Sequence, residues 1–265
     1  MNAPAARAHG SGPPHFLGIG AQKAGTTWLY QMLKMHPEIG FPIQGAHEGK
    51  EVHFWSVRRR RGLEWYRSLF GSEKFAGEIS PDYSIMPPIR IQALRRFNPA
   101  VRLIYILRNP IERAWSAANM RIRLRPQQHP IINDEYFIRD FEHPSMLRRA
   151  NYARNLRNWF SVFPRESLLV MRYEQISADP RGFVRACAGH IGADPDFYSS
   201  IPEVTLRQKV GTPTAELMPR SLYDYLSERH HDHILRLEAF FGWDVSAWLV
   251  SYDEWLARRG QTNAL

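Results

Sequence analysis

Short, unbroken apolar runs alternate with stretches of helical periodicity along this 265-residue chain. The clearest run, VRLIYIL at residues 101–107, is typical of a parallel strand covered on both faces. Three further runs predict strands at residues 15–20, 75–79 and 167–171. Helices are expected at residues 26–35, 87–97, 111–123, 151–163, 180–191, 221–241 and 246–256. The alternation predicts an α/β fold with a central parallel β-sheet flanked by helices.

We expect one domain over residues 15–265, preceded by a disordered tail over residues 1–14. The tail has no apolar core of the kind that a secretion signal needs. No run approaches the ~18 apolar residues of a membrane span. The one cysteine, Cys187, excludes an internal disulfide, so a cytoplasmic protein is expected. Residues 40–75 and 121–150 are expected to be loop-rich excursions.

The net charge of +9 indicates an anionic ligand, whether nucleic acid, an acidic membrane surface or a phosphorylated small molecule. The arginines at residues 58–61 lack the interleaved aromatic residues of a nucleic-acid site. The histidines at 230, 231 and 233 lack the cysteine or carboxylate spacing of a metal site and are expected on a solvated helix face. We therefore expect neither a metal nor a nucleic-acid partner.

The sequence GAQKAGTT at residues 20–27 follows a predicted strand and opens a predicted helix. Such a loop presents backbone N–H groups and the positive end of the helix dipole to an anion. It matches a Walker A loop in its two glycines, but Thr26 stands where that loop has lysine, and Lys23 comes earlier. This counts against an ATP or GTP hydrolase. The residues expected to hold the anion are Gln22, Lys23, Ala24, Gly25, Thr26, Thr27 and Trp28.

A second anion site is expected after the strand at residues 101–107. Arg108 follows this strand directly, and Ser116 lies two helical turns further on. An arginine offers a bidentate fork to a phosphate, and a serine adds a hydroxyl donor. Alone, the pair would indicate only an arginine in a surface turn and a serine on a helix face; beside the first loop, it is expected to bind a phosphate.

The stretch FLGIGAQKAGTTWLYQMLKMHP resembles the 5′-phosphosulfate loop of sulfotransferases that use 3′-phosphoadenosine 5′-phosphosulfate (PAPS). It is most similar to the heparan sulfate and Golgi-type branch and to its bacterial relatives, and the resemblance covers residues 15–245. It implies the P-loop-like sulfotransferase fold, with PAPS as co-substrate and PAP as product. It also implies that Lys23, Gly25, Thr26 and Thr27 hold the 5′-phosphosulfate, while Arg108 and Ser116 hold the 3′-phosphate.

The segment KEVHFW at residues 50–55 resembles the K-E-x-x-F-F segment of the same branch, in which the glutamate matching Glu51 is the general base. A base is needed because the acceptor hydroxyl must lose its proton as the S–O bond forms. His53 is the rival base, since a histidine does this work in the cytosolic branch, and neither residue is the third alternative. Ile79 replaces a lysine of the branch, which weakens the expectation of a heparan-type acceptor and leaves Lys23 as the main cation at the sulfate.

Further nucleotide contacts are expected from weaker matches. Tyr152 opens a stretch similar to the element that precedes the family's fourth strand. Lys209 and Gly211 fall where the family has a basic, glycine-containing loop that closes on the 3′-phosphate and adenine.

Together these features predict a PAPS-dependent sulfotransferase that needs no metal. It would transfer the sulfuryl group to a hydroxyl, with an amine as the second alternative, of a glycan, peptide or small-molecule acceptor. Two alternatives stay open: a small-molecule kinase that uses Mg–ATP with an atypical P-loop, and a non-catalytic nucleotide-binding protein. The sequence leaves the acceptor and the oligomeric state undetermined.

Overall fold

The computed structural model describes residues 12–42, 50–128, 132–208, 210 and 216–262. The chain divides into two compact units. The first unit combines residues 1–107 with 158–211, and the second combines residues 108–157 with 212–265. The expected single domain over 15–265 stays a prediction.

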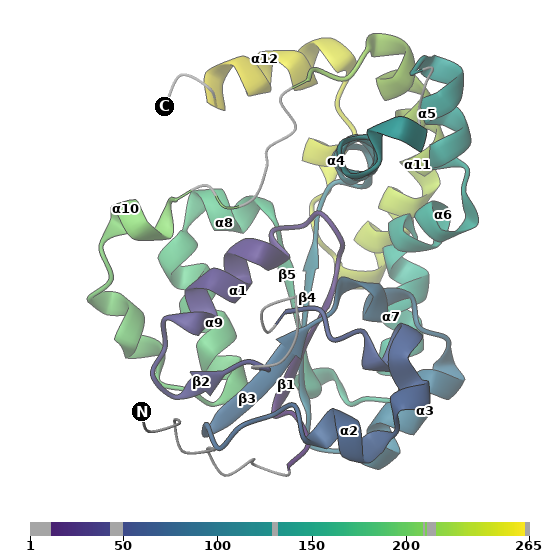
Figure 1. Ribbon diagram of the computed structural model, residues 1–265. Coiled ribbons are helices and arrows are strands. Elements are labelled where there is room, and N and C mark those ends of the chain that lie inside the picture. The colour runs from purple at the N-terminus through teal and green to yellow at the C-terminus, as the bar shows by residue number, and fades with distance from the viewer. Residues whose placement is uncertain (1–11, 43–49, 129–131, 209, 211–215, 263–265) are drawn as a thin grey trace. The chain divides into compact units, whose positions relative to one another are not determined.

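The first unit is built on a five-stranded parallel sheet with the strand order β2-β3-β1-β4-β5 (Figure 1). The four strands expected from apolar runs are present, and the two-residue β2 was missed because so short a strand leaves no pattern. β1 and β4 lie inside the sheet and are almost wholly apolar and buried, as expected for a parallel sheet covered on both faces. The strands are β1 (Phe16–Gly20), β2 (Ile39–Gly40), β3 (Phe75–Ile79), β4 (Arg102–Leu107) and β5 (Leu168–Arg172).

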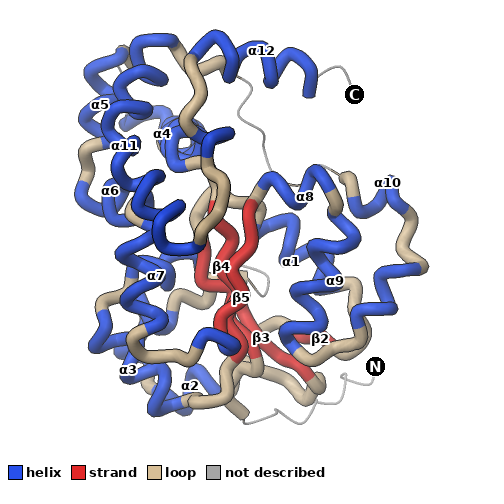
Figure 2. Tube along the Cα trace, turned by 180° about the vertical axis from the view of Figure 1, so that it is seen from behind, coloured by secondary structure: helices blue, strands red, loops and turns tan. Residues whose placement is uncertain are grey.

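Helices cover both faces of this sheet (Figures 1 and 2). One face carries α1 (Thr26–Lys34) and α9 (Pro180–Ile191), and the other carries α2 (Leu63–Arg67) and α3 (Pro88–Phe97). The predicted helices at 26–35, 87–97 and 180–191 are therefore confirmed to within a residue at each end. Two shorter helices complete the unit, namely α8 (Glu174–Ala178) and α10 (Glu203–Leu206).

The parallel arrangement brings the carboxyl ends of the strands to one edge of the sheet. The segment that follows β1 leaves the sheet at that edge and carries candidate site residues. Ligands of open parallel sheets bind at this edge, because loops from several strands meet there. The topology therefore places the predicted loop at residues 20–27 where a ligand is expected.

The second unit is helical. Its core packs Trp115 of α4 against Phe137 of α5, with Tyr223 of α11 and Trp255 of α12 in the same apolar cluster. The sequence predicted a loop-rich region over residues 121–150, but α5 and α6 form there. The few apolar side chains of α5 and α6 are buried against α4 and α11, and this burial stabilises both helices. The helices are α4 (Pro110–Leu124), α5 (Asp134–Phe141), α6 (Pro144–Ala150), α11 (Arg220–Phe241) and α12 (Tyr252–Thr262).

Two other expectations for this unit need correction. A 3₁₀ turn occupies Ser246–Trp248, and α12 begins only at Tyr252, so the helix expected at 246–256 is broken. His230 is 2% exposed rather than solvated, and burial lowers its pKa to about 3. The remaining helix, α7 (Tyr152–Phe160), contains the boundary between the two units. No helix among the described residues is both long and apolar enough to cross a membrane.

Candidate functional site

The loop between β1 and α1 has the backbone of an anion site. Gly25 precedes α1 in the left-handed conformation, with φ 79°, and Lys23 shares this conformation at φ 66°. Gly25, at the N-cap, offers no side-chain hydrogen bond to the first turn of α1, and no acidic residue lies in that turn. Its first amides are therefore available to an anion, which the positive end of the helix dipole also attracts.

Gly25 is required for a second reason, which is close packing. A Cβ atom at this position would lie 2.5 Å from Cδ1 of Ile176 and 3.2 Å from the ring of Tyr173. Both residues follow β5, so the segment after another strand of the sheet fixes the shape of the loop. Glycine alone fits both the positive φ and the contact.

The predicted loop residues fall into two groups: some can contact a ligand through their side chains, and others only through their backbone. Gln22, Lys23 and Thr27 are half-buried, so their side chains reach the surface of the site. Ala24 is fully buried, and Trp28 packs into the core, where its Nε1 donates to the carbonyl oxygen of Leu206 at 2.9 Å. Ala24 and Trp28 can therefore serve a ligand only through their backbone.

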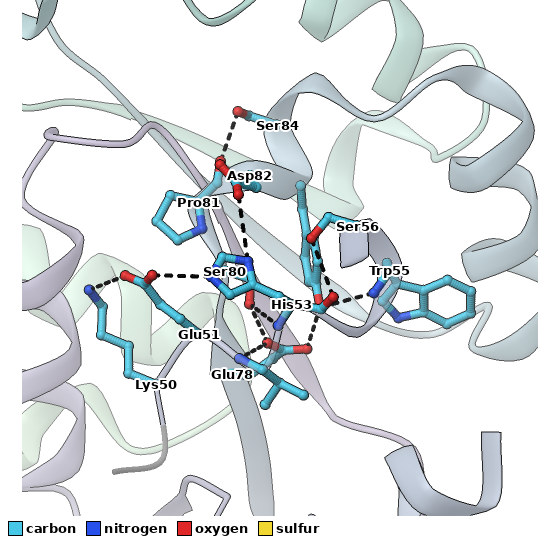
Figure 3. A network of polar contacts seen from close by, with 12 residues as sticks. Lys50, Glu51, His53, Trp55, Ser56, Glu78, Ser80, Pro81, Asp82 and Ser84 are labelled. Carbon is cyan, nitrogen blue, oxygen red and sulfur yellow. Dashed lines mark hydrogen bonds and ion pairs between the residues drawn. The ribbon is translucent and has the colours of Figure 1, made fainter. Parts of the chain in front are cut away.

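The segment after residue 49 is clamped to the end of β3 by three consecutive amides (Figure 3). The amide of Glu51 donates to the carbonyl oxygen of Ile79 at 3.1 Å. Those of Val52 and His53 donate to Glu78 Oε2 at 3.0 Å and Ser80 Oγ at 2.9 Å. Glu51 and His53 have positive φ values of 66° and 56°, a conformation that costs residues other than glycine roughly 1–3 kcal/mol each. The clamp holds this strained backbone in place.

Glu78 is the centre of the clamp and is fully buried. Its Oε1 accepts hydrogen bonds from the hydroxyls of Tyr66 at 2.7 Å and Tyr83 at 2.8 Å. Its Oε2 accepts from Ser80 Oγ at 2.5 Å as well as from the Val52 amide. Burial raises the pKa of Glu78, and the hydrogen bonds from the three hydroxyls oppose that rise. The sequence did not reveal this role, because the partners of Glu78 are spread over residues 52–83.

The carboxylate of Glu51 lies between the ammonium of Lys50 and the imidazole of His53 (Figure 3). Its Oε1 is 2.9 Å from Lys50 Nζ, and its Oε2 is 3.3 Å from His53 Nε2. Burial raises the pKa of Glu51, but the hydrogen bond from His53 and the charge and hydrogen bond of Lys50 outweigh burial and lower it to about 2. Glu51 is therefore ionised at neutral pH.

His53 bridges two carboxylates. Its Nδ1 is 3.7 Å from Asp82 Oδ2, on the side away from Glu51. The hydrogen bond with Glu51 raises the pKa of His53, burial opposes this, and the charge of Asp82 adds to the rise. The two candidate bases are thus brought together as one coupled pair.

A pocket of about 330 Å³ opens beside this pair. One wall comes from the first two turns of α1 and the other from the segment that carries Glu51. The pocket holds both cationic and anionic side chains, which can fix the orientation of a polar ligand. Its lining residues are Thr27, Tyr30, Gln31, Lys50, Glu51, His53 and Arg58.

Arg108 and Ser116, the predicted second anion site, both belong to the second unit. The Arg108 side chain is 16% exposed, and its Nη2 lies 3.0 Å from Glu112 Oε2, one helical turn away. Trp255 Nε1 donates to the other oxygen of Glu112 at 3.1 Å. Ser116 is buried on α4, 6% exposed.

Tyr152, predicted to contact the nucleotide, forms a hydrogen bond within the protein. The hydroxyl donates to the carbonyl oxygen of Arg108 at 2.8 Å, and the side chain is buried. Lys209 and Gly211 lie outside the described residues. Within the part of the chain that is described, no group of three or more metal-ligating side chains comes together.

Comparison with known proteins gives concordant matches. The profile of the family described as the sulfotransferase domain matches residues 13–207. The chain is 30% identical over 203 residues to human heparan sulfate glucosamine 3-O-sulfotransferase 6, covering 70% of this chain and 55% of that protein. It is also 30% identical over 204 residues to human bifunctional heparan sulfate N-deacetylase/N-sulfotransferase 3, covering 71% of this chain and 23% of that protein.

A solved structure supports the same fold. The crystal structure of a sulfotransferase from Alicyclobacillus acidocaldarius superimposes with a TM-score of 0.68 at 27% identity, covering 89% of this chain and 99% of that one. The chain spans only about half the length of the first of the two human relatives.

Proposed function

Because the chain belongs to the sulfotransferase domain family, we propose that it transfers a sulfuryl group from PAPS to an acceptor hydroxyl. The observation that carries the proposal is the juxtaposition of α1 and Glu51 on one pocket. The uncapped start of α1 suits the phosphosulfate, and the ionised Glu51 suits the acceptor proton. Sulfuryl transfer needs both a binding site for the phosphosulfate and a base for the acceptor proton.

Transfer proceeds in one in-line step. The acceptor oxygen forms a bond to sulfur, and the bond between sulfur and the bridging oxygen of the 5′-phosphate breaks. The bonding electrons stay on the phosphate, and the acceptor proton passes to Glu51. The leaving group is a phosphate, so no strong acid is required, and Lys23 offsets charge on the bridging oxygen.

Glu51 is the base in this proposal, and His53 is its positioning partner. Two features support these roles. Glu51 is ionised at neutral pH and is therefore able to accept a proton, and its side chain, 39% exposed, lines the pocket. The raised pKa of His53 favours a protonated ring that donates to Glu51. The acceptor then meets the carboxylate rather than the imidazole.

Arg108 and Ser116 hold the 3′-phosphate in this proposal. Glu112 orients the partly buried guanidinium of Arg108, and the planar fork of an arginine suits a phosphate. This contact would distinguish PAPS from a nucleotide with no 3′-phosphate.

For the acceptor we propose an anionic glycan. Both human relatives carry heparan sulfate in their names, and Arg58 lines the pocket beside Glu51. A guanidinium at this place favours a carboxylate or sulfate on the acceptor. Radiolabelled PAPS with heparan sulfate or neutral dextran as acceptor tests this, and equal labelling of the two would contradict it.

The donor is tested by calorimetric titration of the protein with PAP, AMP and Mg–ATP in parallel. We expect PAP to bind at least tenfold more tightly than AMP, because the 3′-phosphate adds charge-assisted hydrogen bonds worth ~1.5–3 kcal/mol. Equal or tighter binding of Mg–ATP would contradict the proposal and favour a kinase. Tight PAP binding without any turnover of PAPS would favour a non-catalytic nucleotide-binding protein.

A further inference from the structure

Lys50 lies between the start of α1 and the proposed base. Its Nζ donates to Thr27 Oγ1 at 2.9 Å and to Glu51 Oε1 at 2.9 Å, and its side chain is 15% exposed on the pocket. We infer, resting on the proposed function, that Lys50 is a second catalytic cation of the site. It binds the non-bridging oxygens of the transferring sulfuryl group and holds Glu51 at the same time.

The position of Lys50 follows from what lies on either side of it. Thr27 is the second residue of α1, where the amides receive the 5′-phosphosulfate. The sulfuryl group is the outer end of that donor, and in-line transfer requires it to face the acceptor beside Glu51. Because Lys50 hydrogen-bonds to both Thr27 and Glu51, a group between the helix start and the carboxylate meets its ammonium.

The charges make such a cation necessary. The sulfuryl oxygens carry negative charge, and so does Glu51, so the two repel each other as the donor approaches the base. The ammonium of Lys50 lies between them and attracts both. Among the described residues it uses two of its three N–H bonds on Thr27 and Glu51, which leaves one for the ligand.

Lys50 also provides a positive charge that the end of β3 does not provide. Residue 79, at the end of β3, is a fully buried isoleucine that packs against Gly18 of β1. The end of β3 therefore supplies no cation beside Glu51, whereas the segment that carries Glu51 supplies Lys50. In the transfer step Lys50 keeps its protons, while the acceptor proton moves to Glu51.

The test compares PAPS with PAP, which differ by the sulfuryl group. Lys50→Met is expected to weaken PAPS binding at least ~10-fold more than PAP binding, because it removes a charge-assisted hydrogen bond to that group alone. Lys50→Arg, which keeps the charge, should recover much of the difference. Lys74→Met is the matched control, since Lys74 is 63% exposed and forms its described ion pair with Glu38, outside the pocket.

The outcomes separate the alternatives. Equal losses for PAPS and PAP, or no loss for either, would overturn the inference and leave Lys50 a merely structural partner of Glu51. If Lys50→Met does not fold, as judged by thermal melting, Lys50→Gln is measured in its place under the same criterion. A wild-type protein that binds neither nucleotide would contradict the proposed function itself, and with it the inference.

Discussion

The two regions proposed to hold the donor differ in the groups that they offer: one offers backbone amides and the other offers side chains. In the first unit, the loop at residues 20–27 relies on backbone amides and on three residues with positive φ. In the second unit, the region relies on the side chains of Arg108, which precedes α4, and Ser116, which lies within α4. Glu112 is the ion-pair partner of Arg108. A backbone-built site is sensitive to changes of shape, whereas a side-chain-built site is sensitive to changes of functional group. Substitutions in the two regions test this difference.

The largest effect is expected in the first unit, on the chemical step. Glu51→Gln removes the base and should lower turnover of PAPS by roughly 10²–10⁴-fold, the contribution typical of a general base. PAP binding should stay within about twofold, measured by calorimetry, because binding of the 3′- and 5′-phosphates does not use this carboxylate.

The matched control is Glu64→Gln, at an exposed glutamate that pairs with Arg67. It should retain wild-type turnover. Retained turnover in Glu51→Gln would move the role of base to His53 or remove it from both residues.

The next largest effect tests the backbone-built loop. Gly25→Ala adds a Cβ 2.5 Å from Ile176 at a φ of 79°. We expect a loss of ~2–4 kcal/mol in the free energy of unfolding, from strain and overpacking together, with at least tenfold weaker PAP binding. Urea unfolding and PAP titration measure the two.

Gly242→Ala provides the control for strain alone. Gly242 follows α11 in the same left-handed conformation, with φ 67°, but its added Cβ would have no neighbour within 4 Å. The substitution should lower the free energy of unfolding by only ~1–2 kcal/mol and leave PAP binding unchanged. Equal losses at both glycines would show that packing against Ile176 is unimportant.

In the second unit the sensitive change is one of functional group. Arg108→Lys keeps the charge but removes the planar fork, and should weaken PAP binding ~10-fold while AMP binding stays the same. Arg139→Lys is the control, because Arg139 forms the same kind of pair with Glu135, one turn away on an exposed helix face. A parallel loss of AMP affinity would mean that Arg108 does not read the 3′-phosphate.

The smallest effect concerns the pair of His53 and Glu51. Since the folded protein raises the pKa of His53, the stabilisation is fully present below the unfolded pKa of about 6.5 and is lost as pH rises through the folded value. Wild type should therefore exceed His53→Gln in unfolding free energy by up to ~1 kcal/mol at pH 5.5, and by less at pH 9. A difference that grows with pH would contradict the direction of this shift.

Much of the fold and part of the site could be predicted from local patterns. The strand at residues 101–107 is continuous and apolar, and the glycines at 20 and 25 stand at fixed positions around a turn. Such features depend on near neighbours in the chain. The loops expected at 121–150 proved helical because α5 and α6 gain their stability from the helices that bury them.

The sequence by itself determined the parallel sheet, the position of the candidate anion-binding loop and the residue types at the candidate base. Each of these follows from periodicity or from a motif of a few residues. Only the tertiary structure decided the charge state of Glu51, the clamp of Glu78 and the bridge from Lys50 to Thr27. The reason is distance along the chain: Glu78 binds groups from Val52 to Tyr83, and Lys50 reaches a residue 23 positions earlier, so these contacts exist only after folding.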